Sequence, residues 1–292
     1  MYIIVDSGST NTDWRIVYND GKIISATSEG LNPLFLNENT IGDILKTFFS
    51  EYIYKNTSCN SDYEIISDIY FYGAGIVSEE VKNKIFICFR NLLVHTDQGE
   101  KCKMHIWSDL RASALALFGH KKGIACILGT GANSGIWDGK NLVIQRKAGG
   151  YILGDEGSGA YLGKLLLGDY IKDLMPENLK KRFEQQYNLD YASIVKNVYN
   201  TTRPSKFLGS FSYFYKENID NDYIKYILLK AFDAFFERFL EGVNKNLKVS
   251  FAGSIAKNFE EILTLSAENH GFQIGIIVDR PIDLLINVLR ND

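Results

Sequence analysis

Short apolar runs open this chain and predict a β-meander of three strands. The runs lie at 2–5, 14–18 and 22–26. A small, polar segment at 6–13 separates the first two runs, and Asn19-Asp20-Gly21 separates the second from the third. The Asn-Asp-Gly sequence is typical of a tight hairpin turn. We therefore expect strand, loop, strand, turn and strand in succession.

The same pattern returns in the second half of the chain. Apolar runs at 124–128, 134–137 and 142–145 are separated by a Gly/Thr-containing loop at 129–133 and by a turn at 138–141. Both sets thus share a Gly/Thr loop and an Asp-Gly-Lys turn. The repetition predicts two similar α/β lobes, each opening with a meander, that face each other across a cleft.

Helical periodicity occupies much of the remaining chain. Apolar residues recur at three- and four-residue intervals between 41 and 52, and Ser78 precedes a helix with two glutamates in its first turn. A further helix is expected at 110–118. A long buried helix is expected at 224–243, and one more begins at Pro281. Further strands are expected at 69–72, 104–107, 248–251 and 274–278.

These elements suggest a division of the chain into two lobes. We place the N-terminal lobe at 1–110 and the C-terminal lobe at 111–292. The second lobe is expected to carry a helical insertion over about 159–246.

Composition and charge narrow the functional classes. With 292 residues, 46% of them hydrophobic, the chain can build two lobes with a large core. A formal net charge of −3 argues against nucleic acid or an anionic membrane as partner. No segment reaches about 18 uninterrupted apolar residues, so we expect a cytoplasmic protein. The cysteines, expected to be reduced, lack metal-binding spacing and are Cys59, Cys88, Cys102 and Cys126.

The first loop carries candidate chemistry. Asp6 ends a buried strand and is followed by small polar residues that include Gly8, Ser9, Thr10 and Asn11. Backbone N–H groups and hydroxyls in such a loop can approach phosphate oxygens, and an aspartate can hold Mg²⁺ through water. A hairpin turn rich in turn-forming residues would look the same, so this loop alone leaves both interpretations open.

Two later segments favour the phosphate interpretation. Gly129, Thr130 and Gly131 stand at the equivalent point of the second meander. The segment at 251–255 leads from a strand through small residues into a helix, where backbone can approach a flat ligand closely. The chain has neither a Walker P-loop nor a Gly-x-Gly-x-x-Gly run after its first strand.

In order and spacing, these three segments resemble the phosphate-1, phosphate-2 and adenosine segments of the sugar kinase/actin/heat-shock-chaperone ATPase superfamily. The resemblance covers nearly the whole chain. The glycine-flanked run at 149–159, with Gly-Asp-Glu-Gly-Ser at 154–158, resembles N-acetylglucosamine kinases and their bacterial relatives in the BadF/BadG/BcrA/BcrD ATPase family. This resemblance implies two ribonuclease-H-like, actin-like lobes. It also implies transfer of the ATP γ-phosphoryl group, with Mg²⁺, to a hydroxyl of an amino sugar.

The resemblance also implies roles for individual residues. Asp109, which could equally cap a helix, resembles the general base, and Asp6 the Mg²⁺ anchor. The implied nucleotide-binding residues are Gly8, Ser9, Thr10, Asn11, Gly129, Thr130, Gly131, Ala252, Gly253 and Ser254. The implied sugar-binding residues are Asn32, Gly73, Ala74, Asn133, Gly150 and Asp155. Asn11 departs from the pattern, because many relatives carry a basic residue near that position.

Two alternatives stay open. One is an ATPase activator of a 2-hydroxyacyl-CoA dehydratase-type reductase, whose relatives hold an iron–sulfur cluster with paired cysteines. The other is a catalytically inactive sugar or nucleotide sensor, against which the presence of Asp109 argues. The expected partners are ATP and a small sugar, with no nucleic acid and no membrane, and the assembly could be a homodimer.

Overall fold

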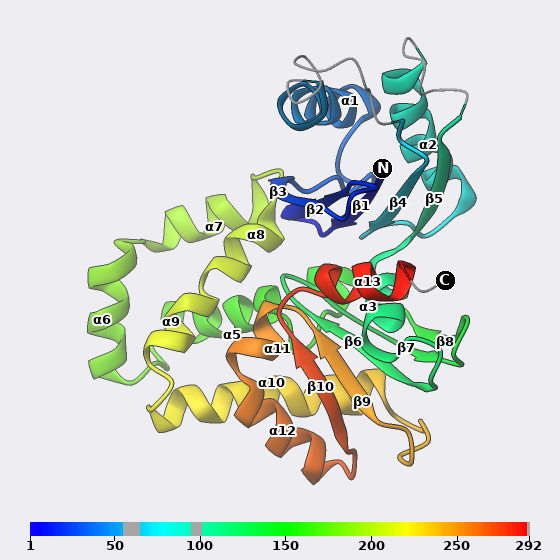
Figure 1. The fold of residues 1–292 in the computed structure, drawn as a ribbon. Coiled ribbons are helices and arrows are strands. Elements are labelled where there is room, and N and C mark those ends of the chain that lie inside the picture. The colour runs from blue at the N-terminus through cyan, green and yellow to red at the C-terminus, as the bar shows by residue number, and fades with distance from the viewer. Residues whose placement is uncertain (55–64, 95–100, 291–292) are drawn as a thin grey trace. The chain divides into compact units, whose positions relative to one another are not determined.

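The computed structural model describes residues 1–54, 65–94 and 101–290 (Figure 1). They form two compact units, which we describe separately. The first unit combines Met1–Ala112 with Ile282–Asp292, and the second is Ser113–Pro281. The chain thus crosses between units close to the expected position 110. Its last segment, which we expected in the second lobe, belongs instead to the first unit.

The first unit contains a mixed five-stranded sheet. Its strands are β1 (Tyr2–Ser7), β2 (Asn11–Val17), β3 (Ile23–Glu29), β4 (Asp68–Gly73) and β5 (Lys103–Ser108). Their order is β3-β2-β1-β4-β5, in which β1, β2 and β3 form the predicted antiparallel meander. Strands β4 and β5 run parallel to β1.

The second unit repeats this topology. Its strands are β6 (Gly123–Leu128), β7 (Ala132–Trp137), β8 (Leu142–Arg146), β9 (Val249–Ala252) and β10 (Ile274–Val278). Read from the meander, the order is β8-β7-β6-β9-β10, with β9 and β10 parallel to β6. The two matching sheets confirm the predicted α/β fold with a duplicated, actin-like lobe.

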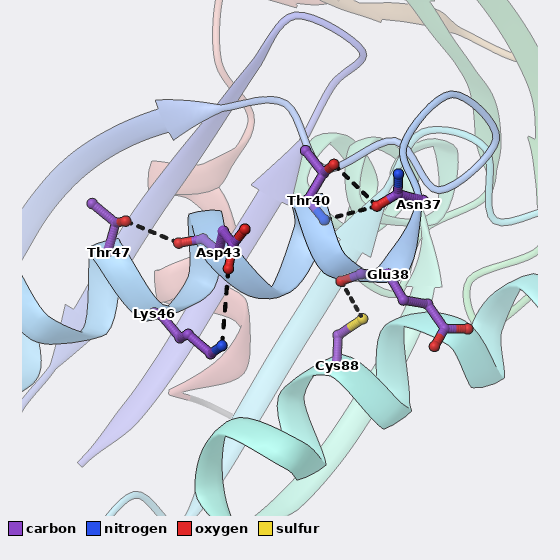
Figure 2. A network of polar contacts seen from close by, with 7 residues as sticks. All are labelled: Asn37, Glu38, Thr40, Asp43, Lys46, Thr47 and Cys88. Carbon is purple, nitrogen blue, oxygen red and sulfur yellow. Dashed lines mark hydrogen bonds and ion pairs between the residues drawn. The ribbon is translucent and has the colours of Figure 1, made fainter.

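Two helices cover one face of the first sheet. Helix α1 (Glu38–Phe48) begins where the Asn37 side chain accepts hydrogen bonds from the backbone and hydroxyl of Thr40 (Figure 2). Helix α2 (Glu79–Leu93) begins at the predicted cap, Ser78. The two helices pack together, and the Cys88 thiol of α2 contacts a main-chain oxygen of α1 (Figure 2). We expected one helix to continue to residue 52, but after α1 the chain widens into a π-helix, η1 (Phe49–Tyr54).

The last helix explains the division of the chain. Helix α13 (Ile282–Leu289) packs against β1 and β2 and buries an apolar face that includes Leu285. Asp283 in its first turn pairs with Arg15 of β2 at 2.7 Å. Sequence periodicity identifies such a helix but does not show which sheet it covers.

Helices predominate in the second unit. The predicted buried helix is α10 (Asp222–Phe239), whose Phe235 and Phe236 pack on Phe251 of β9. Full burial of one such side chain contributes roughly 1.5–3 kcal/mol. The other helices there are α4 (Gly150–Leu153), α5 (Gly159–Ile171), α6 (Glu177–Tyr187), α7 (Tyr191–Tyr199), α8 (Pro204–Ser210), α9 (Ser212–Glu217), α11 (Ser254–Asn258) and α12 (Glu260–Asn269). Helix α3 (Asp109–Phe118) follows β5.

Both candidate phosphate loops are shorter than expected. The β1–β2 ladder continues through Asp6 and Ser7, which pair with Asp13 and Thr12, so only residues 8–10 connect the strands. The Ser7 and Thr12 hydroxyls lie 2.9 Å apart in the interior; Ser7 also accepts the Leu31 N–H, and Thr12 donates to the Glu29 carbonyl. Polar composition predicted a loop here, but mutual hydrogen bonding lets these residues extend the strands.

Two further features concern membrane-spanning helices and cysteine pairing. In the part of the chain that the structure describes, no helix is long and apolar enough to span a membrane. Cys88, Cys102 and Cys126 are free cysteines, and Cys59 lies outside the described residues.

Candidate active site

One edge of the first sheet gathers several of the candidate residues. Ser7 of β1, Gly73 of β4 and Ser108 of β5 are neighbours in register. Because these strands are parallel, the segments that follow them leave the sheet at the same edge. The backbone N–H of Ala74 donates to the Ser7 carbonyl at 2.8 Å, and Asp109 follows directly after β5.

Carboxylates concentrate negative charge at this edge. Burial, reinforced by the charges of Asp109 and Asp13 and opposed by Arg15, raises the pKa of Asp6 to about 7. Asp6 and Asp13 are paired across β1 and β2. A nearby cation would relieve their repulsion and favour the ionised form of Asp6. The donor chemistry at Asp6 therefore fits a hard divalent cation.

Asp109, the candidate base, is the first residue of α3. Burial raises its pKa to about 6, although a hydrogen bond from the Leu110 N–H to Asp109 Oδ1, at 2.8 Å, opposes the effect. The neighbouring Ser108 hydroxyl accepts the Arg111 N–H at 3.3 Å and so provides the side-chain cap of α3. A carboxylate offers about four acceptor positions, so Asp109 retains capacity for a substrate hydroxyl.

The loop at 8–10 is tied to its surroundings by hydrogen bonds. Gly8 N donates to the Asn11 carbonyl at 2.9 Å, and Gly30 N donates to the Thr10 carbonyl at 3.0 Å. The Ser9 hydroxyl accepts from Asn32 Nδ2 at 3.0 Å. The structure thus places Asn32 directly against the candidate phosphate loop, while Asn11 is the exposed first residue of β2.

Asn32 also contacts the segment after β4. Its side chain is buried, and its Oδ1 accepts the Leu34 N–H at 3.0 Å. Gly75 has a φ of +81°, and a Cβ at this position would overlap Asn32 Oδ1. The absence of a side chain at Gly75 therefore allows the 73–75 segment to reach Asn32.

In the second unit, the loop at 129–131 is attached through its carbonyls to the start of α5. The Gly129 and Thr130 carbonyls accept hydrogen bonds from Gly159 N and Ala160 N, at 2.8 and 3.0 Å, at the start of α5. In a planar trans peptide the next N–H points opposite to the carbonyl. The N–H groups of Thr130 and Gly131 therefore point away from α5, as an anion-binding loop requires.

The Asp155 side chain is hydrogen-bonded to the end of this loop. Its Oδ1 accepts the Ala132 N–H at 3.2 Å, and its backbone has a left-handed φ of 56°. Burial, with a smaller contribution from Glu156, raises the pKa of Asp155 to about 6 against the effect of the Ala132 bond. Such a conformation in a non-glycine residue costs energy and persists only where its surroundings hold it.

The candidate adenosine segment lies beside the same loop. Ala252 is paired with Ile127 of β6, and Ser254 begins α11. Gly253 has a φ of +120°, and a Cβ there would overlap the Leu128 carbonyl. Residues 252–254 and 129–131 are therefore neighbours in the second unit.

Comparison with known proteins decides the family. The sequence matches no protein-family model and no curated protein. A solved structure from Porphyromonas gingivalis, described as a candidate N-acetylglucosamine kinase, is 35% identical to this chain. The match covers 100% of this chain and 99% of that protein, with a TM-score of 0.90. This chain belongs to the N-acetylglucosamine kinase family.

More distant solved structures share the fold. A protein from Chromobacterium violaceum, also described as a candidate N-acetylglucosamine kinase, is 16% identical with a TM-score of 0.72, and 99% of this chain and 98% of that one are covered. A ROK family glucokinase from Streptomyces griseus, solved with glucose and AMPPNP, is 14% identical with a TM-score of 0.53. There the coverage is 99% of this chain and 98% of that one.

Two candidate sugar-binding residues, Asn133 and Gly150, take no part in the hydrogen bonds described above. Asn133 lies in β7 rather than in the loop, and its Oδ1 accepts from Ser134 N at 3.0 Å and from Gln145 Nε2 at 3.3 Å. Gly150 begins α4 with a left-handed φ of 70°.

Sequence reasoning did not single out Arg15 or Gln145. Arg15 pairs with Asp283 of α13, and Gln145 donates to Asn133 of β7. Neither residue belongs to a recognisable motif. Cross-strand pairing identifies Gln145, and the packing of α13 on β2 identifies Arg15, so both contacts require the tertiary structure.

Proposed function

We propose that this protein transfers the γ-phosphoryl group of ATP to a hydroxyl of an amino sugar, N-acetylglucosamine or a close relative. The observation that carries the proposal is the position of Asp109. It follows β5 at the sheet edge that also holds Asp6 and the 8–10 loop. Membership of the N-acetylglucosamine kinase family supports the choice of substrate class.

Asp109 would act as the general base. A sugar hydroxyl is a weak nucleophile, and transfer of its proton to a positioned carboxylate contributes about 10²- to 10⁴-fold. Because burial raises the pKa of Asp109 to about 6, the carboxylate is a stronger base than an exposed aspartate and is still ionised at neutral pH. The Leu110 N–H bond orients it.

Asp6 would hold Mg²⁺, which supplies neutralisation of phosphate charge when bound. Among the residues that the structure describes, no group of three or more His, Cys, Asp or Glu side chains is arranged to hold a metal ion. This fits Mg²⁺, which binds through one or two carboxylates and takes its other ligands from water and substrate phosphates.

The phosphate and nucleotide roles would fall to the short loops. In the first unit, the candidates are the residues of the 8–10 loop with Asn11. In the second, the N–H groups of Thr130 and Gly131, which point away from α5, would bind phosphate oxygens. Residues 252–254 would bind the adenosine. Phosphoryl transfer depends on positioning and charge neutralisation more than on covalent chemistry, so such loops suit it.

The sugar would be bound by polar side chains and exposed backbone. We assign this role to Asn32, Gly73 and Ala74 in the first unit, and to Asn133, Gly150 and Asp155 in the second. Asp155 would then serve two purposes, since it also supports the 129–131 loop. We further propose a cytoplasmic location, where ATP is available.

The reductase-activator alternative receives no support from the position of Cys126. Cys126 lies within β6, and complete burial raises the pKa of its thiol well above the usual value. Iron–sulfur ligation requires thiolates that can reach a cluster. A buried, protonated thiol in a central strand does not meet that requirement.

A coupled ADP-release assay over a panel of hexoses and amino sugars tests the proposal. We expect ADP release that depends on sugar and is fastest with N-acetylglucosamine or a close relative. Mass spectrometry should detect the sugar monophosphate in equal amount. ATP hydrolysis without a phosphorylated sugar, or no response to any sugar, would contradict the proposal.

A further inference from the structure

Two side chains that we assign to different substrates touch directly in the first unit. Ser9 belongs to the candidate phosphate loop and Asn32 to the candidate sugar site. Asn32 Nδ2 donates to the Ser9 hydroxyl oxygen at 3.0 Å. A change in the hydrogen bonding of Ser9 at the phosphate loop can therefore alter the orientation of Asn32 at the sugar site, and the reverse.

The Asn32 side chain is held in one orientation. It is only 5% exposed, and its Oδ1 accepts the Leu34 N–H at 3.0 Å. Its main-chain carbonyl accepts from Phe35 N and Leu36 N, at 3.2 and 3.1 Å. Because the amide oxygen is engaged by Leu34, the amide nitrogen must face Ser9. Flipping the amide would bring its NH₂ group against the Leu34 N–H and lose that bond.

Ser9 is held by the loop on its other side. Gly8 N bonds the Asn11 carbonyl, and the Thr10 carbonyl accepts from Gly30 N. These bonds fix the backbone on both sides of Ser9, so the hydroxyl stays within reach of Asn32. The segment from Gly30 to Asn32 is thereby attached to the phosphate loop twice, by backbone and by side chain.

We propose that Ser9 is a positioning residue whose hydrogen bond to Asn32 couples nucleotide binding to sugar binding. This inference rests on the proposed function. A hydroxyl has one donor hydrogen and two acceptor lone pairs. While Ser9 Oγ accepts from Asn32, its own hydrogen remains able to donate to a phosphate oxygen.

The donor-to-acceptor direction of these hydrogen bonds determines whether binding of one substrate favours or opposes binding of the other. A phosphate that accepts from the Ser9 hydroxyl makes the hydroxyl oxygen a better acceptor, which strengthens the bond from Asn32. Asn32 is then more firmly oriented for sugar, and binding of one substrate favours the other. The net worth of one neutral hydrogen bond, roughly 2- to 10-fold in affinity, sets the upper limit of the coupling.

Calorimetry on the full-length protein tests the coupling. The affinity of AMPPNP with Mg²⁺ is measured without sugar and with saturating N-acetylglucosamine, and the ratio of the two affinities is the coupling factor. We expect a factor above one and no more than about 10-fold for the wild type. By thermodynamic linkage, AMPPNP must raise the sugar affinity by the same factor. In Ser9→Ala the factor should fall to about one, and Ser9→Thr should retain it.

The ratio isolates coupling from direct binding. Loss of a direct phosphate contact in Ser9→Ala lowers both AMPPNP affinities equally and cancels. Ser28→Ala is the matched control, because the Ser28 hydroxyl accepts from Trp14 Nε1 at 2.9 Å in the same sheet but has no bond to Asn32 in the part of the chain that the structure describes. It should reduce stability and leave the factor unchanged.

Three results would overturn the inference: a wild-type factor of one, an unchanged factor in Ser9→Ala, or equal loss of coupling in Ser28→Ala. None of them touches the proposed function if the wild type still phosphorylates a sugar in the ADP-release assay. Failure of every sugar in that assay would instead reject the proposed function itself. The two failures are therefore distinguishable.

Discussion

Replacement of Asp109 by asparagine separates the chemical role of this residue from its structural one. Asparagine has nearly the same shape and can still accept the Leu110 N–H, which lies 2.8 Å from Oδ1. It cannot accept a proton from a sugar hydroxyl. Since a positioned general base contributes about 10²- to 10⁴-fold, we expect kcat of Asp109→Asn to fall by a factor in this range.

The same substitution should stabilise the fold at neutral and higher pH. Burial raises the pKa of Asp109 from 3.8 to about 6, so the folded state binds this proton more tightly than the unfolded state. Ionisation thus reduces the stability of the wild type as the pH rises from 3.8 through about 6. The difference amounts to at most roughly 3 kcal/mol, because one pKa unit corresponds to about 1.4 kcal/mol. Asparagine carries no such penalty.

Activity and stability should therefore move in opposite directions. We expect a higher Tm for Asp109→Asn than for wild type at about pH 8, with the difference nearly absent at about pH 4. In the wild type, kcat/KM should fall as the pH drops through about 6, where Asp109 becomes protonated. The assays are coupled ADP release for kcat, calorimetry for AMPPNP and sugar affinity, and thermal unfolding at both pH values.

Asp68→Asn is the matched control. Asp68 begins β4, a strand in the same parallel set, and pairs with His105 at 2.9 Å. Its replacement should leave kcat near the wild-type value. If kcat of Asp109→Asn stays near wild type, Asp109 is not the base and Asp155 becomes the next residue to test. If AMPPNP affinity is also lost, the substitution has disturbed the site, and the separation of roles is refuted.

Five other substitutions, one of them a control, test the remaining assignments. Asp6→Asn should sharply reduce Mg²⁺-dependent turnover while leaving the fold intact, and wild-type turnover in a folded variant would remove Asp6 from the site. Gly253→Ala should lower the free energy of unfolding by roughly 2 kcal/mol or more, since its Cβ would overlap a main-chain oxygen of β6. Gly242→Ala has a similarly left-handed φ of +72° but no atom near the added carbon, so it should cost less in the same denaturant titration. Asp155→Asn should raise the KM for sugar without loss of stability, because asparagine tolerates the left-handed backbone and can still accept an N–H bond; an unchanged KM would exclude a sugar contact. Cys126→Ser should retain ATP-dependent activity, and anaerobically purified wild type should show no iron–sulfur absorbance; a cysteine-dependent cluster would contradict the kinase proposal.

Local sequence pattern determined the duplicated architecture. Short apolar runs separated by Gly-containing turns predicted both meanders, and both formed as antiparallel ladders. Ser78 was identified as a helix cap and accepts the Val81 N–H, because capping depends on residues only three positions apart. Where neighbours along the chain decide the conformation, the sequence alone was sufficient.

Local pattern also identified the residue types of the candidate site. Small residues at 8–10, 129–131 and 252–254 were recognised because close backbone approach requires them. Their hydrogen-bond partners were not predictable. The Ser9 bond to Asn32 and the Asp155 bond to Ala132 each join segments more than twenty residues apart.

Tertiary structure decided the contacts that depend on packing and register. Asp6 and Asp13 remained in strands despite their polar neighbours, because the Ser7 and Thr12 hydroxyls bond each other and the backbone at 29–31. Helix α13 joined the first unit, where its apolar face is buried and Asp283 meets Arg15. The amphipathic pattern of a helix shows that one face must be buried, but many surfaces can satisfy that requirement. The choice is made by the complementary shape and charge of residues distant in the chain, which meet only when the sheet has formed.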